Sequence, residues 1–264
     1  SYFRTYYAPN NATLVVAGAI APAEGFALAE RYFGSVPAQE PPAKIVNDEP
    51  PQHGPKRVVL RQAAELPAAA IAYHAVAALH PDRPAFDVLQ YVLAEGESSR
   101  FYRALVRGPE LATTVDVSFN SGIDPELFWV YAQARPGKPL EAVKAGVAKE
   151  IARLREQPPD EHELRKAKNL LQAGYVRGLK TVSGKANQLG VYETVYGDYA
   201  EMFHEVDRWE AVTAADVQRV ARTYLVDDGA TTVDLLPSGK PARAAHGAAG
   251  AAGPPGGVVH REGR

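Results

Sequence analysis

The sequence predicts an α+β fold in which an antiparallel sheet is packed by helices. Strand-like and helix-like segments come in groups along the chain, whereas a doubly wound parallel sheet needs a crossover helix after each strand. Two strand-like runs, residues 112–119 and 127–134, are separated only by turn residues such as Gly122 and Pro125, which is the spacing of an antiparallel hairpin. The 264 residues are 46% hydrophobic and 23% charged, an ordinary globular composition with enough apolar side chains for a core.

The chain opens with one predicted strand and one predicted helix. Residues 13–18 form a short apolar, β-branched run after the turn residues 9–11, and this pattern predicts a buried strand. A helix is expected from Pro22, which suits a first turn, to Gly34, which suits a helix stop. Residues 35–55 are rich in proline and have little apolar periodicity, so we expect an extended linker that contains a domain boundary.

The following segments predict a further α+β domain, which ends near residue 237. A capping box at Thr213 and Asp216 marks the start of its last helix. Residues 238–264 are rich in Ala, Gly and Pro and are expected to be a disordered tail. In chain order, the expected elements are strands at 58–60 and 70–74, helices at 84–95 and 98–106, the two hairpin strands, helices at 140–154, 158–175, 183–196 and 213–224, and a strand at 231–236.

The composition excludes several classes of function. The formal net charge is −2, so the chain as a whole is not attracted to nucleic acid or to anionic membranes. It contains no Cys, which excludes disulfides, thiolate metal ligands and a thiol nucleophile. No apolar run approaches the roughly 20 residues that a membrane-spanning helix needs. No G-x-S-x-G motif is present, and Gly96 to Arg100 do not match a phosphate-binding loop.

The histidines do not form a metal-binding motif in this chain. None of the seven belongs to an H-E-x-x-H or H-x-x-E-H sequence. His162 is followed by Glu163, and His204 by Glu205. Adjacent residues of a helix point in different directions, so neither pair can bind one metal ion together. Both pairs are expected to lie on solvated helix surfaces. His74 follows Tyr73 in a strand, where alternation places one of the two toward the core, and a structural histidine is expected in preference to a metal ligand. The others are His53 and His80, which are expected to be exposed, and His246 and His260 in the tail.

Two pairs of opposite charges are expected on the surface of the polar helix at 158–175. They are Glu161 with Arg165 and Glu163 with Lys166. The residues themselves therefore assign no catalytic residue and no metal ligand in this chain, and they leave the substrate-binding residues unknown.

Five motifs, taken together and in order, give the chain a family resemblance. They are YYAPNNATLVVAG, RYFGSVP, GESSRFYRALV, DEHELRKAKN and WEAVTAADVQRVARTYL. The sequence from residue 1 to about residue 237 resembles the C-terminal portion of M16 zinc metallopeptidases, the group of insulinase, pitrilysin and the mitochondrial processing peptidase.

The resemblance implies a fold and a domain arrangement. Members look like two homologous α+β domains of the LuxS/MPP-like metallohydrolase fold, joined by an extended linker, which together form half of a closed chamber. Residues 1–50 then correspond to the end of a first domain with its linker, and residues 56–237 to a second domain. Because the sequence begins at Ser1 with structured-looking residues and no Met, we expect a processed or truncated chain.

The resemblance also implies where the zinc chemistry lies. The catalytic H-x-x-E-H motif belongs to the first domain, so Zn²⁺ is expected in that missing domain or in a zinc-bearing partner subunit, and this chain carries no cofactor. The helix from Phe86 to Glu95 takes the place of the zinc helix and has no His. Active members use an Arg and a Tyr of the second domain to hold the substrate backbone, but Val106 and Thr113 take these two positions and Arg107 lies one residue away.

Two functions are compatible with this resemblance. The first is the non-zinc-binding part of a peptidase that hydrolyses peptides or unfolded segments, in which this chain forms chamber wall and substrate contacts. The alternative is a non-catalytic scaffold or partner subunit that acts by protein assembly. Many bacterial relatives are extracytoplasmic, so the resemblance favours the periplasm or a similar compartment.

Overall fold

The computed structural model describes residues 2–43 and 49–239 and divides the chain into two compact units. One unit contains the described part of residues 1–50 together with residues 175–203, and the other contains residues 51–174 together with the described part of residues 204–249. The sheet belongs entirely to the second unit.

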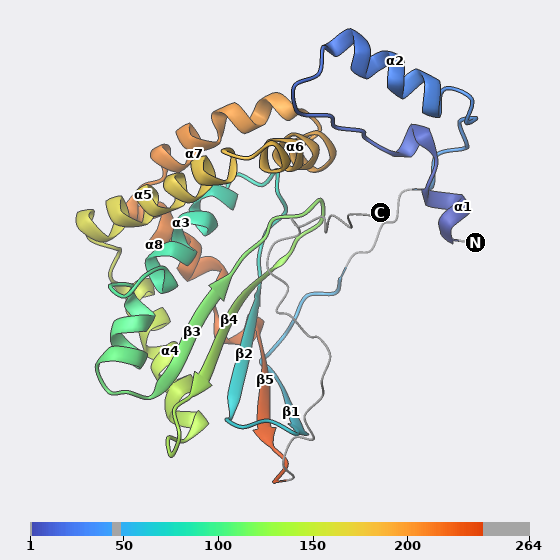
Figure 1. Cartoon of the computed structure of the whole chain (residues 1–264). Coiled ribbons are helices and arrows are strands. Elements are labelled where there is room, and N and C mark those ends of the chain that lie inside the picture. Colours follow the sequence, from blue (N-terminus) through green and yellow to red (C-terminus); the bar gives the residue numbers. More distant parts are fainter. Residues whose placement is uncertain (1, 44–48, 240–264) are drawn as a thin grey trace, which may run out of the picture. The chain divides into compact units, whose positions relative to one another are not determined.

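The second unit is built around a five-stranded sheet with the strand order β1-β5-β2-β4-β3 (Figure 1). The pairs β5–β2, β2–β4 and β4–β3 are antiparallel, whereas β1 and β5 run parallel. The predicted α+β class and the predicted hairpin are therefore confirmed. The strands are β1 (Lys56–Gln62), β2 (Ala68–His74), β3 (Ala112–Ser118), β4 (Leu127–Ala134) and β5 (Ala230–Pro237).

Helices cover one face of this sheet. Helices α3 (Arg83–Ala94) and α4 (Leu140–Glu156) contact the strands, and α8 (Ala214–Tyr224) packs against both helices (Figure 1). Alternate residues of β4 follow this arrangement, because Phe128 and Val130 face the helices and are fully buried.

The core of the second unit is centred on the ring of Phe86 in α3. Its centroid lies 4.9 Å from that of Phe119, 5.8 Å from that of Phe128 and 5.0 Å from that of Tyr224. Since these rings come from helices α3 and α8 and from the hairpin, burial of aromatic surface joins the helical layer to the sheet.

Most predicted helix ends agree with the structure. Thr213 and Asp216 form the expected capping box, and Gly96, with φ of +76°, follows the end of α3. The helix expected at 98–106 contains a π-helix at Tyr102–Arg107, and the helix expected at 183–196 ends in a second one at Tyr192–Tyr196. The remaining helices of the second unit are α5 (Glu161–Gly178), whose last residues belong to the first unit, α7 (Glu205–Ala211) and a 3₁₀ turn at Asp227–Gly229. Helix α6 (Val182–Val191) and all but the last residue of a 3₁₀ turn at Tyr199–His204 belong to the first unit.

The first unit contains α1 (Tyr2–Tyr6), a 3₁₀ turn at Pro9–Asn11, and α2 (Pro22–Phe33), which ends before Gly34 as predicted. The predicted strand at 13–18 is wrong for the chain described here. These residues have no regular secondary structure and join no ladder among the described residues.

The expected burial of this segment is wrong as well. Leu14 is 58% exposed and Val16 is 52% exposed. A strand needs hydrogen-bonding neighbours, and an apolar run cannot be buried without a surface to cover it. Of the expected disordered tail, residues 240–264 lie outside the described residues.

Candidate functional site

The described residues contain no group of three or more His, Asp or Glu side chains that could hold a metal ion. In the same part of the chain, no helix is long and apolar enough to cross a lipid bilayer. His53, His80, His162 and His204 are exposed as expected, whereas His246 and His260 lie outside the described residues.

One of Tyr73 and His74 faces the core, as the alternation of strand residues predicts. Tyr73 is the inward-facing residue of the two, with 5% of its surface exposed, and His74 points to the exposed side of β2. Successive strand residues face opposite sides of a sheet, so only one of the two could be buried. Burial raises the pKa of the Tyr73 hydroxyl to about 12.

The sheet face opposite α3 and α4 is apolar and accessible. Trp129 and Tyr131 of β4 are each 40% exposed, although their neighbours Phe128 and Val130 are buried. At the other end of the sheet, the β1 residues Val58 and Leu60 are each 46% exposed, and their partners in β5 lie on the same face. Aromatic and aliphatic side chains on one broad strand surface can contact an extended peptide without selecting a single sequence.

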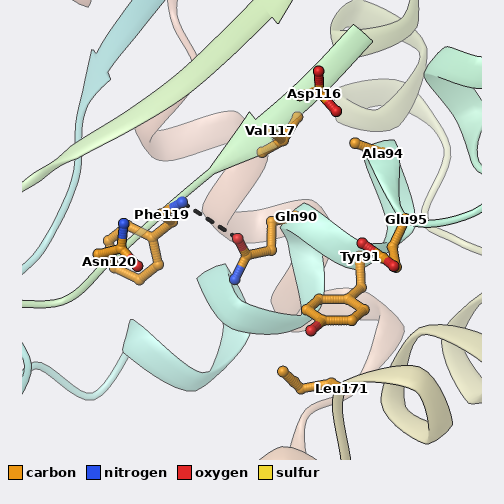
Figure 2. Close-up of a pocket in the computed structure, with 9 residues that line it drawn as sticks. All are labelled: Gln90, Tyr91, Ala94, Glu95, Asp116, Val117, Phe119, Asn120 and Leu171. Atoms are coloured by element: carbon orange, nitrogen blue, oxygen red, sulfur yellow. Dashed lines mark hydrogen bonds between the residues drawn. The ribbon is translucent and has the colours of Figure 1, made fainter. Parts of the chain in front are cut away.

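A polar pocket lies where β3, the last strand of the sheet, meets α3 (Figure 2). It has a volume of about 280 Å³. Just beyond the end of β3, the backbone N–H of Phe119 donates a hydrogen bond of 3.3 Å to Oε1 of Gln90. The lining residues are Gln90, Tyr91, Ala94, Glu95, Asp116, Val117, Phe119, Asn120 and Leu171.

The charge of this pocket is negative. Glu95 at the end of α3 and Asp116 on β3 are both exposed carboxylates, and the hydroxyl of Thr114 donates a 2.7 Å hydrogen bond to Asp116. The pocket combines two acidic groups with the edge of a sheet, so it can accept a basic side chain from a chain that lies along β3. The sequence contains one signal for this residue: the alternation of apolar and polar side chains along β3 predicts that Asp116 is exposed.

The two positions matched to the family's Arg and Tyr are not brought into an active arrangement. Thr113 lies at a β-bulge, because Ala112 pairs with Ala134 and Thr114 with Gln133. The Thr113 hydroxyl donates a 3.0 Å hydrogen bond to Oε1 of Gln133. Threonine lacks the phenolic hydroxyl that a tyrosine would supply at this position. Val106 is half-buried and Arg107 is exposed at the end of the π-helix.

A buried ionic cluster joins α3 to α7, and the expectation that Glu205 is solvated is wrong. Arg83 pairs with Asp87 at 2.6 Å and with both carboxylate oxygens of Glu205, which is fully buried. The indole N–H of Trp209 donates to Asp87 at 2.9 Å. Burial raises the pKa of Asp87 to about 6, against the opposing effects of Arg83 and Trp209. Every charge has a close partner, so the cluster is structural.

One of the two expected surface pairs is wrong. Arg165 lies 3.1 Å from Glu161, as expected. Glu163 instead accepts hydrogen bonds from Arg100 and Arg103, while Lys166 donates to the hydroxyl of Ser98 at 2.8 Å. Helical spacing predicted a local partner, but packing places a nearly buried guanidinium within reach of Glu163.

Comparison with known proteins identifies the family. The model of the family described as the peptidase M16 inactive domain matches residues 1–171. The chain belongs to the M16 peptidase inactive-domain family. The zinc protease PqqE of Helicobacter pylori is 28% identical over 236 residues, which cover 88% of this chain and 53% of that protein. An uncharacterized zinc protease of Streptomyces coelicolor is 32% identical over 144 residues, or 54% of this chain and 31% of that protein.

Solved structures have the same fold. A protease from Helicobacter pylori superposes with a TM-score of 0.84 at 26% identity and covers 89% of this chain and 57% of that chain. A peptidase M16 inactive domain from Pseudomonas fluorescens has the same fold, with a TM-score of 0.71 at 17% identity, and covers 83% and 52% of the two chains. The M16 chain described here spans about half the length of these curated relatives or less.

The family and fold predictions are therefore confirmed.

Proposed function

We propose that this chain is the C-terminal, non-zinc-binding part of an M16 metallopeptidase that hydrolyses peptides or unfolded segments. Residues 1–50 are the end of a first domain with its linker, and residues 56–237 are the second domain. The chain forms part of the chamber wall and contacts the substrate, and Zn²⁺ is held by the first domain or by a zinc-bearing partner subunit.

The accessible sheet face is the observation that carries this proposal. Among the described residues of the second unit, helices cover one face of the sheet, and Trp129, Tyr131, Val58 and Leu60 are accessible on the other. This second face is suited to line a space that receives apolar segments. Folded proteins normally bury such a surface, and peptides with exposed apolar side chains can bind it.

The pocket beside β3 supplies a second contact. An extended substrate segment along this edge would place a Lys or Arg side chain between Glu95 and Asp116. Zinc, where it is bound in such peptidases, supplies an activated water, and the residues described here hold no part of that chemistry. The extracytoplasmic location implied by the resemblance stays a prediction.

The test is the sequence and activity of the whole protein. We expect an H-x-x-E-H motif with a downstream Glu in the first domain or in a co-purifying M16 subunit. The purified protein should contain zinc and cleave a quenched fluorescent peptide, and replacing the first His of the motif by Ala should remove both properties. Absence of the motif from both places, or cleavage without zinc, would overturn the proposal.

A further inference from the structure

Strand β1 forms the edge of the sheet at the end opposite β3 (Figure 1). Every residue from Lys56 to Gln62 is exposed, so both faces of this strand are accessible among the described residues. Val58, Val59 and Leu60 form a continuous apolar run, and each is 46% exposed. A continuous apolar run is typical of a strand with neighbours on both sides, whereas exposed edge strands usually carry charged residues or Pro. β1 therefore has the sequence of an interior strand at the position of an edge strand.

The outer edge of β1 also presents unpaired backbone groups. The N–H of Ser238, just after β5, donates a 3.0 Å hydrogen bond to the carbonyl of Gln62, so the backbone groups of Gln62 point toward β5. These directions alternate along a strand, and Arg57, Val59 and Arg61 therefore point their N–H and C=O groups outward. Within residues 2–43 and 49–239, no hydrogen bond reaches these outward groups. An edge of this kind is a template for a further strand.

Two charges near β1 favour a second copy of the protein as the source of that strand. Lys56 at the start of β1 and Glu65 in the loop after it are both exposed, and neither forms an ion pair with another described residue. They lie four residues before and five residues after Leu60. Two strands that pair in antiparallel orientation about a twofold axis at Leu60 would therefore bring each Lys56 beside the Glu65 of the other copy.

We infer that β1 pairs in antiparallel orientation with β1 of a second copy, with Leu60 on the twofold axis. Val59 of each copy then lies opposite Arg61 of the other, and both residues have outward backbone groups, as a hydrogen-bonded pair requires. The two sheets become one continuous sheet, and their open faces, each with Trp129 and Tyr131, lie on the same side of it. This interface goes beyond the proposed peptidase function and does not depend on zinc.

The charges select this register over the one with the axis a residue earlier. That register would place Arg57 opposite Arg61 of the second copy on the same face, and like charges directly opposite each other destabilise a pair of strands. The carboxylates near Arg57 belong to Asp234 and Glu141, which are already paired with Arg57 and with Lys144. No carboxylate of this cluster is therefore left to compensate a second guanidinium.

A single cysteine at the axis tests the inference. The 264 residues contain no Cys, so Leu60→Cys introduces the one thiol of this part of the protein. Residues on the axis form a non-hydrogen-bonded pair with Cα atoms about 4.5 Å apart, which a disulfide can bridge. Val58→Cys is the matched control on the same face, because Val58 lies opposite Gln62 of the second copy.

Oxidation of the whole protein gives the readout. On a non-reducing gel, Leu60→Cys should form a disulfide-linked dimer, and Val58→Cys and the unsubstituted protein should not. A failure of Leu60→Cys to cross-link, or equal cross-linking of the two variants, would overturn the inference.

Charge reversal tests the contact between Lys56 and Glu65. In analytical ultracentrifugation of the whole protein, Lys56→Glu and Glu65→Lys should each weaken the dimer several-fold, because each places like charges together twice, and the double reversal should restore it. Lys138→Glu, at an exposed lysine between β4 and α4, changes the net charge equally and should leave the dimer unchanged. A monomeric protein, no restoration by the double reversal, or an equal effect of Lys138→Glu would overturn the inference.

Discussion

Glu205 is fully buried with its negative charge compensated by Arg83 and, at 3.2 Å, by Arg208. Replacing Glu205 by Ala would leave the Arg83 guanidinium, which is also buried, without its main partner. Removal of one member of a buried ion pair typically costs about 3–5 kcal/mol, and we expect the free energy of unfolding to fall by this amount. Urea denaturation measures the change.

Glu161 offers a matched control for this substitution. Its pair with Arg165 lies on the surface of α5, where the side chains are 87% and 62% exposed. Glu161→Ala should leave the free energy of unfolding nearly unchanged, because exposed pairs are screened by solvent. If both substitutions had similar effects, the cluster around Arg83 would not stabilise the contact between α3 and α7.

Asp87 predicts a pH dependence of stability. Its pKa in the folded chain is raised to about 6 by burial, above the roughly 3.9 of an unfolded chain. The folded state therefore binds more protons than the unfolded state between about pH 4 and pH 6, and stability through Asp87 is lost as the pH rises through this range. Between pH 7 and pH 5 the chain should gain about 1 kcal/mol from this group.

Asp87→Asn isolates this effect, since the amide does not titrate. Urea denaturation at pH 5, 6 and 7 should give a smaller pH dependence for the variant by about 1 kcal/mol. Carboxylates with lowered pKa values, such as Asp82 and Asp216, lose their contribution only at lower pH. Parallel pH profiles for the two proteins would refute the assignment to Asp87.

At the scale of elements, two side chains cap the start of α8. The hydroxyl of Thr213 accepts a 3.1 Å hydrogen bond from the backbone N–H of Asp216, and the Asp216 carboxylate accepts one of 3.0 Å from the N–H of Thr213. Thr213→Ala should cost about 1 kcal/mol in the free energy of unfolding, and Thr213→Ser should retain most of the stability. A loss as large for Ser as for Ala would exclude capping as the cause.

Strand β4 carries the prediction for substrate contact. In the active whole protein, Trp129→Ala should raise KM for an apolar peptide several-fold with unchanged zinc content, because the accessible indole contributes apolar contact area. Val233 of β5 lies on the same face of the sheet. Val233→Ala removes less apolar area, so it should raise KM by a smaller factor. An unchanged KM for both variants would show that this face of β4 and β5 does not contact the substrate.

At the scale of the whole molecule, the first unit presents apolar side chains that the described residues do not cover. Leu14, Val16 and Phe26 are all more than half exposed. The purified 264-residue chain should therefore self-associate or hold residues 1–50 loosely, and replacing these three residues by Ser should reduce association. Light scattering after size-exclusion chromatography measures this. A monomeric chain with uniform protection in hydrogen exchange would contradict the prediction.

Local patterns were sufficient for several elements. Pro22 and Gly34 bound a helix as expected, the Thr213 capping box formed, and the turn between residues 119 and 127 joined an antiparallel pair. These features depend on residues close in the chain, and their physical causes are fixed φ angles, side-chain caps and alternating burial. The resemblance to M16 peptidases rested on something else, namely five sequence motifs that occur in the order seen in that family.

The order of residues along the chain was therefore enough to predict the fold class, the hairpin and most helix ends, and it contains no M16 zinc motif. Three features became visible only in the folded chain: β5 lies inside the sheet beside β1, Arg83 pairs with Glu205, and Glu163 pairs with Arg100. Each of these contacts joins residues far apart in the chain, so periodicity does not encode them. The segment 13–18 has the composition of a strand, but strand formation and burial depend on neighbours that its own residues do not provide.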